Sequence, residues 1–173
     1  MKLTWFGESA LRIYVGGQIV VVDPDHAPES VDRGELLAGA DRIVATGDAL
    51  ASIDPETWRP KPMPRMTEEA PAVEIARMGQ ALLIAAAGEA PLVVLGGGEL
   101  PRSGRWAEGA VIVLTEAREG LVGEVRALLD RARPRLFALA MDDQALDRVI
   151  SQLAEHLDGS GLVSLEPGLA LEV

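Results

Sequence analysis

The sequence contains no cysteine and only two histidines among its 173 residues. Without cysteine there is no disulfide framework, no thiolate metal site and no cysteine nucleophile, which suits a reducing cytoplasm. Neither His26 nor His156 belongs to a His-x-His or His-x-x-x-His pair. Because zinc sites need several nitrogen, sulfur or carboxylate ligands in fixed geometry, we expect no stoichiometric zinc or iron and no cofactor.

Positive charge and long apolar runs are also scarce. The formal net charge is -11, so a phosphate backbone or an anionic membrane would be repelled. The longest apolar run, residues 81–87, is far shorter than the about 20 residues that span a bilayer. The first residues show no apolar signal segment followed by a cleavage site. We therefore expect a cytoplasmic protein that binds neither nucleic acid nor membrane.

Aromatic residues make up only 3% of the chain, whereas hydrophobic residues make up 48%. The core must therefore be built mainly from Ala, Val, Leu and Ile. A chain of 173 residues can bury such a core without disulfides, and we expect residues 1–173 to form a single domain.

Apolar patterning predicts several strands. Residues 11–15 alternate between apolar and polar side chains, as in a half-buried strand, and Gly16-Gly17 predicts a tight turn after them. Residues 19–22 and 136–139 are apolar on both faces, so we expect interior strands there. Residues 42–45 predict another buried strand.

The predicted strands, helices and turns divide the chain into two similar halves. Helical spacing predicts helices over residues 31–37, 121–132 and 146–157, the first capped by Ser30 or Asp32. Hairpins that open each half, with helices placed later, predict a β-sandwich covered by helices on its outer faces.

Two further turns indicate how the strands of each half are connected. Residues 81–95, with a turn at Gly88-Glu89, repeat the strand–turn–strand arrangement of residues 11–22, which indicates a weak internal repeat. Residues 162–165 and 169–173 are predicted to end the chain as a hairpin.

Both ends of the chain carry motifs of a known family. The opening Met-Lys-Leu-Thr-Trp-Phe-Gly-x-Ser-Ala is followed by Leu11-Arg12-Ile13, Gly17 and Val20-Val21-Val22-Asp23-Pro24, and Leu165-Glu166-Pro167-Gly168 precedes the last predicted strand. This order resembles metal-dependent hydrolases of the metallo-β-lactamase superfamily, in particular the small branch with ascorbate-phosphate lactonase-like proteins. The resemblance implies an α/β (α+β) fold, a four-layer αββα sandwich.

The resemblance places the family's metal ligands at positions that carry none here. Members bind one or two metal ions, usually zinc, through a Thr-His-x-His-x-Asp-His loop after the fourth strand. Thr46 matches the threonine, but the ligand positions have become Gly47, Ala49, Ala51 and Ser52. A later His-Ala-Gly-Asp turn corresponds to residues 95–98, a last histidine falls near Ala140-Met141, and the early Gly-His-Ser is Gly7-Glu8-Ser9, again without histidine.

A polar cluster remains as a candidate for acid–base chemistry: Glu8, Asp23, Asp25 and His26. Carboxylates with an imidazole could hold a hard cation or act as general acid and base. The ordinary alternative is that Asp23 caps a turn and Glu8 faces solvent. Ser9 and Ser52 have no histidine nearby in the sequence, so a serine nucleophile is only weakly indicated.

The candidate ligand-binding residues are Asp48, Gly97 and Glu99. Residues 96–99, Gly-Gly-Gly-Glu, could form a backbone nest for an anion, or a tight turn in place of the old metal loop. The segment is not a P-loop, because no Lys-Ser/Thr follows it.

The proline-rich connection from Asp54 to Pro71 is long for an ordered loop. Within it, residues 58–66 combine the Trp, Met and basic side chains that are enriched at interfaces. We expect this stretch to be partly ordered and to contact another subunit or the mouth of the former active site. The alternative is a solvated crossover loop.

Three functions compete. The first is a catalytically degenerate protein that kept the scaffold to bind a small molecule or another protein. The second is a hydrolase of lactones or phosphoesters with a relocated site at Glu8, Asp23, Asp25 and His26. The third is a subunit, homo-oligomeric or paired with an active relative, that associates through the proline-rich segment. A fold alone does not decide among them.

Overall fold

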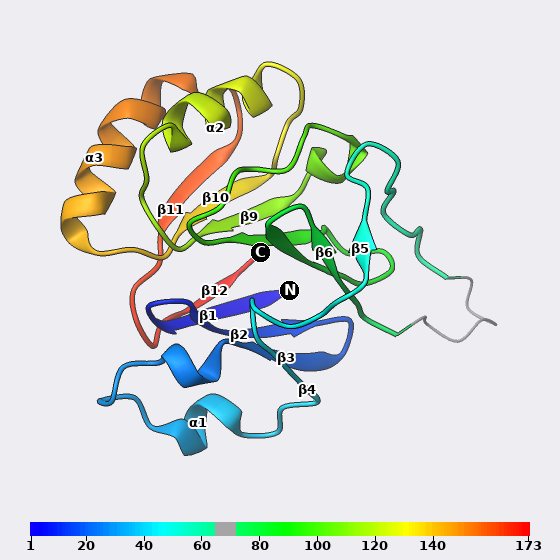
Figure 1. The fold of residues 1–173 in the computed structure, drawn as a ribbon, viewed down its shortest axis with the longest axis vertical. Helices are drawn as coiled ribbons and strands as arrows, with labels where there is room; N and C mark the ends of the chain where they lie inside the picture. Colours follow the sequence, from blue (N-terminus) through cyan, green and yellow to red (C-terminus); the bar gives the residue numbers. More distant parts are fainter. Residues whose placement is uncertain (65–71) are drawn as a thin grey trace.

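The described part of the chain, residues 1–64 and 72–173 of a computed structural model, forms two β-sheets (Figure 1). The smaller sheet has the order β12-β1-β2-β3-β4. Its strands are β1 Lys2–Gly7, β2 Ala10–Val15, β3 Gln18–Val22, β4 Arg42–Val44 and β12 Ala170–Glu172. Its neighbouring strands are antiparallel except for β3 and β4, which are parallel.

The larger sheet has the order β11-β10-β9-β8-β7-β6-β5. Its strands are β5 Ser52–Ile53, β6 Glu74–Met78, β7 Ala81–Ala85, β8 Leu92–Leu95, β9 Val111–Leu114, β10 Leu136–Leu139 and β11 Gly161–Ser164. Strands β8 to β11 run parallel, whereas β7 is antiparallel to both β6 and β8. The fold is therefore mixed α/β with two mixed sheets.

Helices lie on the outer face of each sheet (Figure 1). The helix α1 Arg33–Leu37 packs on the smaller sheet, and α2 Leu121–Leu129 and α3 Asp143–Leu153 pack on the larger one. Short 3-10 turns are η1 Pro24–His26, η2 Arg105–Ala107 and η3 Ala154–His156. No helix in the described residues is long and apolar enough to cross a membrane.

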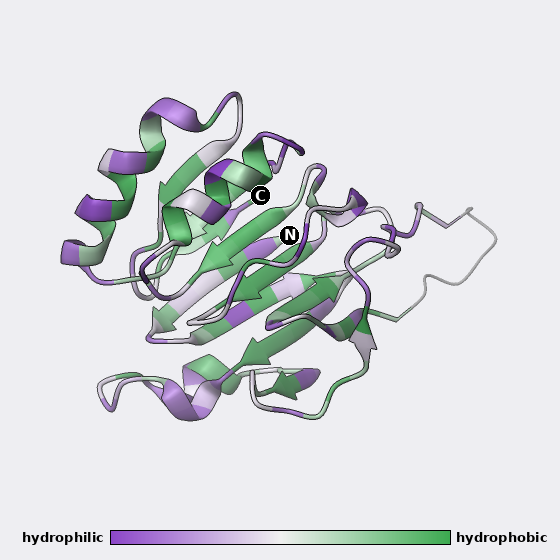
Figure 2. Ribbon diagram, turned by 45° about the horizontal axis from the view of Figure 1, so that its top comes forward, coloured by the Kyte–Doolittle hydropathy of each residue, from purple (hydrophilic) through white to green (hydrophobic). Residues whose placement is uncertain are grey.

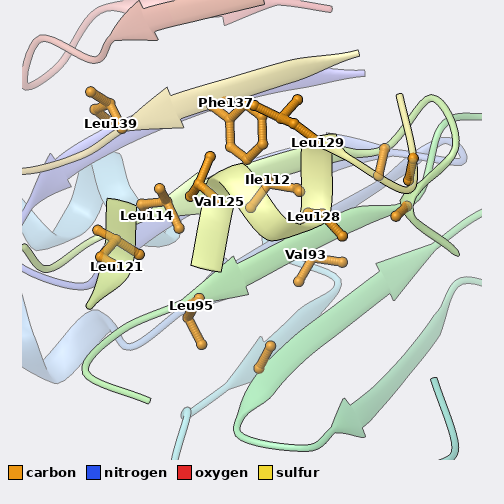
Figure 3. Packing of buried hydrophobic residues seen from close by; sticks show 14 of the residues in the cluster. Val93, Leu95, Ile112, Leu114, Leu121, Val125, Leu128, Leu129, Phe137 and Leu139 are labelled. Atoms are coloured by element: carbon orange, nitrogen blue, oxygen red, sulfur yellow. The ribbon is translucent and has the colours of Figure 1, made fainter. Parts of the chain in front are cut away.

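Hydrophobic clusters fill the spaces between these layers. Side chains from both sheets, such as Leu11 and Val94, share one buried cluster. On the other face of the larger sheet, Phe137 packs among residues of α2 such as Leu128 (Figure 3), and Leu36 of α1 covers the smaller sheet. Strands covered on both faces must be apolar throughout, which explains the continuous green strands of Figure 2.

Several sequence predictions are confirmed. Strands β3 and β10 are interior, and the Gly16-Gly17 turn joins β2 and β3 as an antiparallel hairpin with Val15 opposite Gln18. Both glycines have positive φ, of 55° and 76°, which tight hairpin turns require. Asp32, not Ser30, caps α1, because its carboxylate accepts the N–H groups of Gly34 and Glu35.

The internal repeat also has a structural counterpart. In β1–β4 and in β6–β9, antiparallel strands are followed by a last strand that pairs in parallel. The two halves thus share one topology, each in its own sheet.

Two strand predictions are wrong. Strands β11 and β12 do not form a hairpin: β11 pairs with β10 in the larger sheet, whereas β12 pairs with β1 in the smaller one. Strand β4 is not fully buried, because it lies at the sheet edge and leaves Ile43 57% exposed. Both errors concern strand order, which local hydrophobic patterns do not encode.

The described part of the proline-rich segment docks on the protein's own surface. Trp58 packs against the core beside α2, and its Nε1 donates to Glu74 Oε1 at 3.2 Å. Lys61 Nζ lies 2.8 Å from Glu74 Oε2, and this hydrogen bond lowers the pKa of the Glu74 carboxyl against the effect of burial. Glu74 begins β6, at the opposite end of the sheet from the rim described below, so residues 58–64, the described part of the segment, do not make the predicted contact with the site mouth.

Of the residues expected to form an interface in this segment, Arg65 and Met66 lie outside the described residues. Met63 is 74% exposed. Contact with another subunit stays a prediction.

Candidate functional site

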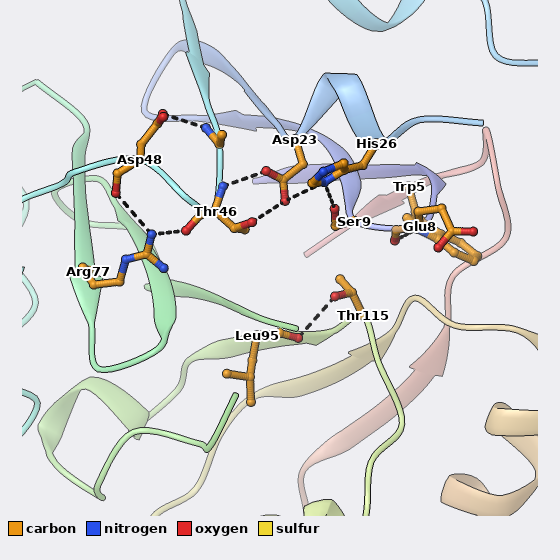
Figure 4. A network of polar contacts seen from close by, with 11 residues as sticks. Trp5, Glu8, Ser9, Asp23, His26, Thr46, Asp48, Arg77, Leu95 and Thr115 are labelled. Atoms are coloured by element: carbon orange, nitrogen blue, oxygen red, sulfur yellow. Dashed lines mark hydrogen bonds and ion pairs between the residues drawn. The ribbon is translucent and has the colours of Figure 1, made fainter. Parts of the chain in front are cut away.

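The carboxyl ends of strands from both sheets meet at one edge of the sandwich. Strands β1, β3 and β4 end there in the smaller sheet, and β8, β9 and β10 end there in the larger one. We call the loops that follow these strands the strand-end rim. Figure 4 shows the residues that it brings together, and most sequence candidates lie in it.

Asp23 is the buried anchor of the rim, with only 2% of its surface exposed. Its N–H donates to Val44 O at 2.9 Å, and its carboxylate accepts the Thr46 N–H at 2.6 Å and the Thr46 hydroxyl at 2.8 Å. Val22 and Val44 are opposite each other in the parallel β3–β4 pair, so the residues after them are adjacent. The Asp23 carboxylate therefore holds two loops together.

The loop of Thr46 to Asp48 is closed by its own hydrogen bonds. The Asp48 carboxylate accepts the Ala45 N–H at 2.8 Å, which makes it part of a turn. Arg77 Nη2, from β6, donates to Thr46 O and, at 3.3 Å, to Asp48 O. Asp48 thus helps to close this loop, and its predicted role in ligand binding stays a prediction.

Ser9 and His26 form a side-chain pair that the sequence analysis did not predict, because the two residues are far apart in the chain. Ser9 Oγ lies 3.0 Å from His26 Nδ1, although the residues are 17 positions apart. Asp23 Oδ2 lies 3.9 Å from the same ring nitrogen. The signal available in the sequence was that each residue follows a predicted strand at the same sheet edge.

The remaining predicted cluster is not assembled. The exposed Asp25 carboxylate pairs with Arg33 at 2.5 Å and lies apart from the Asp23 anchor. Glu8 has a positive φ of 47° and its carbonyl oxygen accepts the Trp5 Nε1–H at 2.9 Å. The structure therefore joins Asp23 with His26 but leaves Asp25 outside.

The loop of residues 96–101 is fixed by side chains rather than open as an anion nest. Arg118 Nε donates to Gly98 O at 2.9 Å, and Glu124 Oε2 accepts the Leu100 N–H at 2.9 Å. Gln80 Oε1 accepts the Glu99 N–H at 2.9 Å. A Cβ on Gly97 would lie 2.7 Å from Glu116 Oε2, so a carboxylate already faces this backbone. This carboxylate disfavours an anion at Gly97, whereas ligand binding by Gly97 and Glu99 stays a prediction.

The same loop depends on one strong ion pair. Arg118 and Glu124 are joined by two hydrogen bonds, one of 2.8 Å and one of 2.5 Å. Hydrogen bonding to Glu124 raises the pKa of Arg118, and hydrogen bonding to Arg118 lowers the pKa of Glu124, in both cases against burial. Both groups are therefore charged at neutral pH.

A pocket of about 360 Å³ opens between the loops after β1, β9 and β10. Its apolar surface consists of Trp5, Pro28, Ala117, Ala140, Met141 and Ala145. Its charged groups are Glu8, Glu116, Asp142 and Arg148. We call this feature the strand-end pocket. Asp142 Oδ1 is engaged as the cap of α3, accepting the Ala145 N–H at 2.8 Å.

The rim does not fit a dinuclear metal centre. Within residues 1–64 and 72–173, no group of three or more His, Cys, Asp or Glu is placed to hold a metal ion. Gly47, Ala49 and Ala51 have no side-chain donor atom, and Asp23 uses both carboxylate oxygens on Thr46.

The chain matches no family model, and no curated protein or solved structure is significantly similar to it. The resemblance to metallo-β-lactamases therefore stays a prediction from the sequence motifs.

Replacing Asp23 tests its structural role. Asp23→Asn keeps the size and tolerates positive φ, but removes the charge that strengthens both hydrogen bonds to Thr46. We expect urea unfolding at pH 7 to show a loss of about 1–2 kcal/mol. Asp25→Asn is the matched control, since it breaks only an exposed ion pair and should cost less than about 0.5 kcal/mol. Equal stability of the two variants would contradict the anchor role.

Proposed function

We propose that this chain is a catalytically degenerate member of the metallo-β-lactamase superfamily that binds a small organic ligand in the strand-end pocket. The helix-covered pair of sheets and the repeated β1–β4 and β6–β9 topology support a four-layer αββα sandwich of that type. The replaced ligand positions, from Gly47 to Ser52, support the loss of metal chemistry.

The observation that carries the proposal is the pocket itself. Its floor is apolar, and its walls carry Glu8, Glu116 and Arg148, which form no ion pair among the described residues. Ligand sites combine an apolar concave surface with a few polar groups that orient the ligand. The other polar groups of the rim, Asp23 and Asp48, are engaged by backbone N–H groups of nearby loops.

The pocket can be tested by filling it. Ala117→Phe adds a ring to the pocket wall, whereas Ala154→Phe, an exposed position at the end of α3, is the matched control. In ligand-observed NMR with a fragment library, wild-type protein and Ala154→Phe should share hits that Ala117→Phe loses. Hits that persist in folded Ala117→Phe would place binding elsewhere.

A second candidate function is hydrolysis of an ester or lactone without metal. It is favoured by the 3.0 Å contact of Ser9 Oγ with His26 Nδ1 and by the buried Asp23 carboxylate 3.9 Å from that nitrogen. Glu8 and Asp23 both have a positive φ of 47°, and strained backbone often marks functional sites. His26 would take the Ser9 proton during attack on the carbonyl carbon, and Asp23 would stabilise the resulting imidazolium.

The geometry differs from a catalytic triad in one respect. Ser9 and Asp23 approach the same ring nitrogen, whereas a triad uses both nitrogens of the histidine. This difference makes ligand binding the better-supported function.

A fluorophosphonate probe distinguishes the two functions, because it phosphonylates only an activated serine. If Ser9 is a nucleophile, intact-mass analysis will show one adduct that Ser9→Ala abolishes and that Ser52→Ala, an exposed serine, retains. If the probe does not label the wild-type protein, the hydrolase function is excluded and the binding function is not affected.

A further inference from the structure

A second cleft lies at the end of the larger sheet opposite the rim, between the segment of residues 56–60, the η2 turn and the end of α2. It has a volume of about 700 Å³. Arg59, Arg105 and Arg131 line it together with Ser103. A smaller adjoining pocket shares Ser103 and Arg131 and adds Arg102. We call these two connected depressions the arginine cleft.

This clustering is unusual for the chain. The protein has 16 Lys and Arg residues against 27 Asp and Glu residues, yet four arginine side chains line the two depressions of the arginine cleft. Like charges at short range repel one another, so arginines of the cleft that lack an acidic partner favour an external anion.

Three carboxylates also line the cleft, and each has a partner. Glu124, in the smaller depression, is paired with Arg118. Glu56 Oε1 lies 3.5 Å from Arg102 Nη1, and Glu108 Oε2 accepts the Arg133 N–H at 3.4 Å. Arg59 donates to backbone carbonyl oxygens of its own turn, Glu56 O and Trp58 O. Arg105 and Arg131, in contrast, form no ion pair with any described residue.

Close packing holds the backbone beside the cleft. Trp106 is fully buried in the core beside α2, and its Nε1 donates to Arg102 O at 2.9 Å. Gly104 packs so closely that a Cβ there would lie 2.1 Å from Pro55 O. The backbone that carries Arg102 and Arg105 is therefore fixed before any ligand binds, which reduces the entropy cost of binding.

We propose that the arginine cleft binds a small polyanion, one that bears phosphoryl groups or several carboxylates. Guanidinium groups bind both kinds of oxyanion through paired N–H donors. The net charge of -11 repels nucleic acid, so the ligand is a small molecule that fits within the cleft. This site is independent of the strand-end pocket.

Calorimetric titration of the full chain at constant ionic strength tests the proposal, with inorganic pyrophosphate in one arm and citrate in the other. We expect saturable binding in at least one arm, and its identity distinguishes phosphoryl from carboxylate ligands. Arg105→Gln should weaken it about tenfold or more, because a charge-assisted hydrogen bond is lost. Arg42→Gln, an exposed arginine on β4, is the control and should bind as the wild type does.

Arg131→Gln provides a second, independent variant should Arg105→Gln fail to fold. Weakening in either folded variant, with Arg42→Gln unchanged, supports the site. Absence of saturable binding in both arms would overturn it. Equal affinity of the wild type and folded Arg105→Gln or Arg131→Gln would also overturn it, since binding would then not depend on the cleft.

Discussion

The burial of apolar side chains on both faces of both sheets is the constraint on which the structure depends. Val111 of β9 faces the other sheet, whereas its neighbour Ile112 faces the helices, and both are fully buried. Such a strand needs cover on each side, so two sheets must face each other and helices must close the outer surfaces. Burial of a Val or Ile side chain contributes about 1.5–3 kcal/mol, and the central strands β7, β8 and β9, buried at every position, repeat this contribution.

This arrangement also creates the rim, because the carboxyl ends of parallel strands leave their loops at one edge. Polar residues there are adjacent by geometry and not by sequence. Asp23 and Thr46 are joined because β3 and β4 run side by side. Ser9, just before β2, reaches His26 because β2 lies beside β3, with Leu11 opposite Val22. Most polar groups of the rim thus form hydrogen bonds that hold its own loops. The strand-end pocket is the part of the rim that can bind a ligand.

The sequence predicted which residues form strands better than it predicted which strands lie side by side. Residues 19–22 and 136–139 are continuous apolar runs, a local property, and both proved to be interior strands. The last hairpin failed because Leu171 pairs with Leu3 across the whole chain, a choice that local turn residues do not reveal. The site showed the same division: Glu8, Asp23 and His26 lie at the predicted edge, but Asp25 turns to Arg33, its partner in the next helix.

We propose that the rim lacks the ligands for a metal ion and therefore binds a small molecule rather than hydrolysing one. Hydrogen bonds to Asp23 fix Thr46, whereas residues 47–52, which follow Thr46, contain no histidine. The most direct measurement is elemental analysis of protein purified without chelator or metal-affinity tag. The account predicts zinc and iron far below one ion per chain after gel filtration. Near-equimolar zinc or iron, retained by the folded protein, would contradict it.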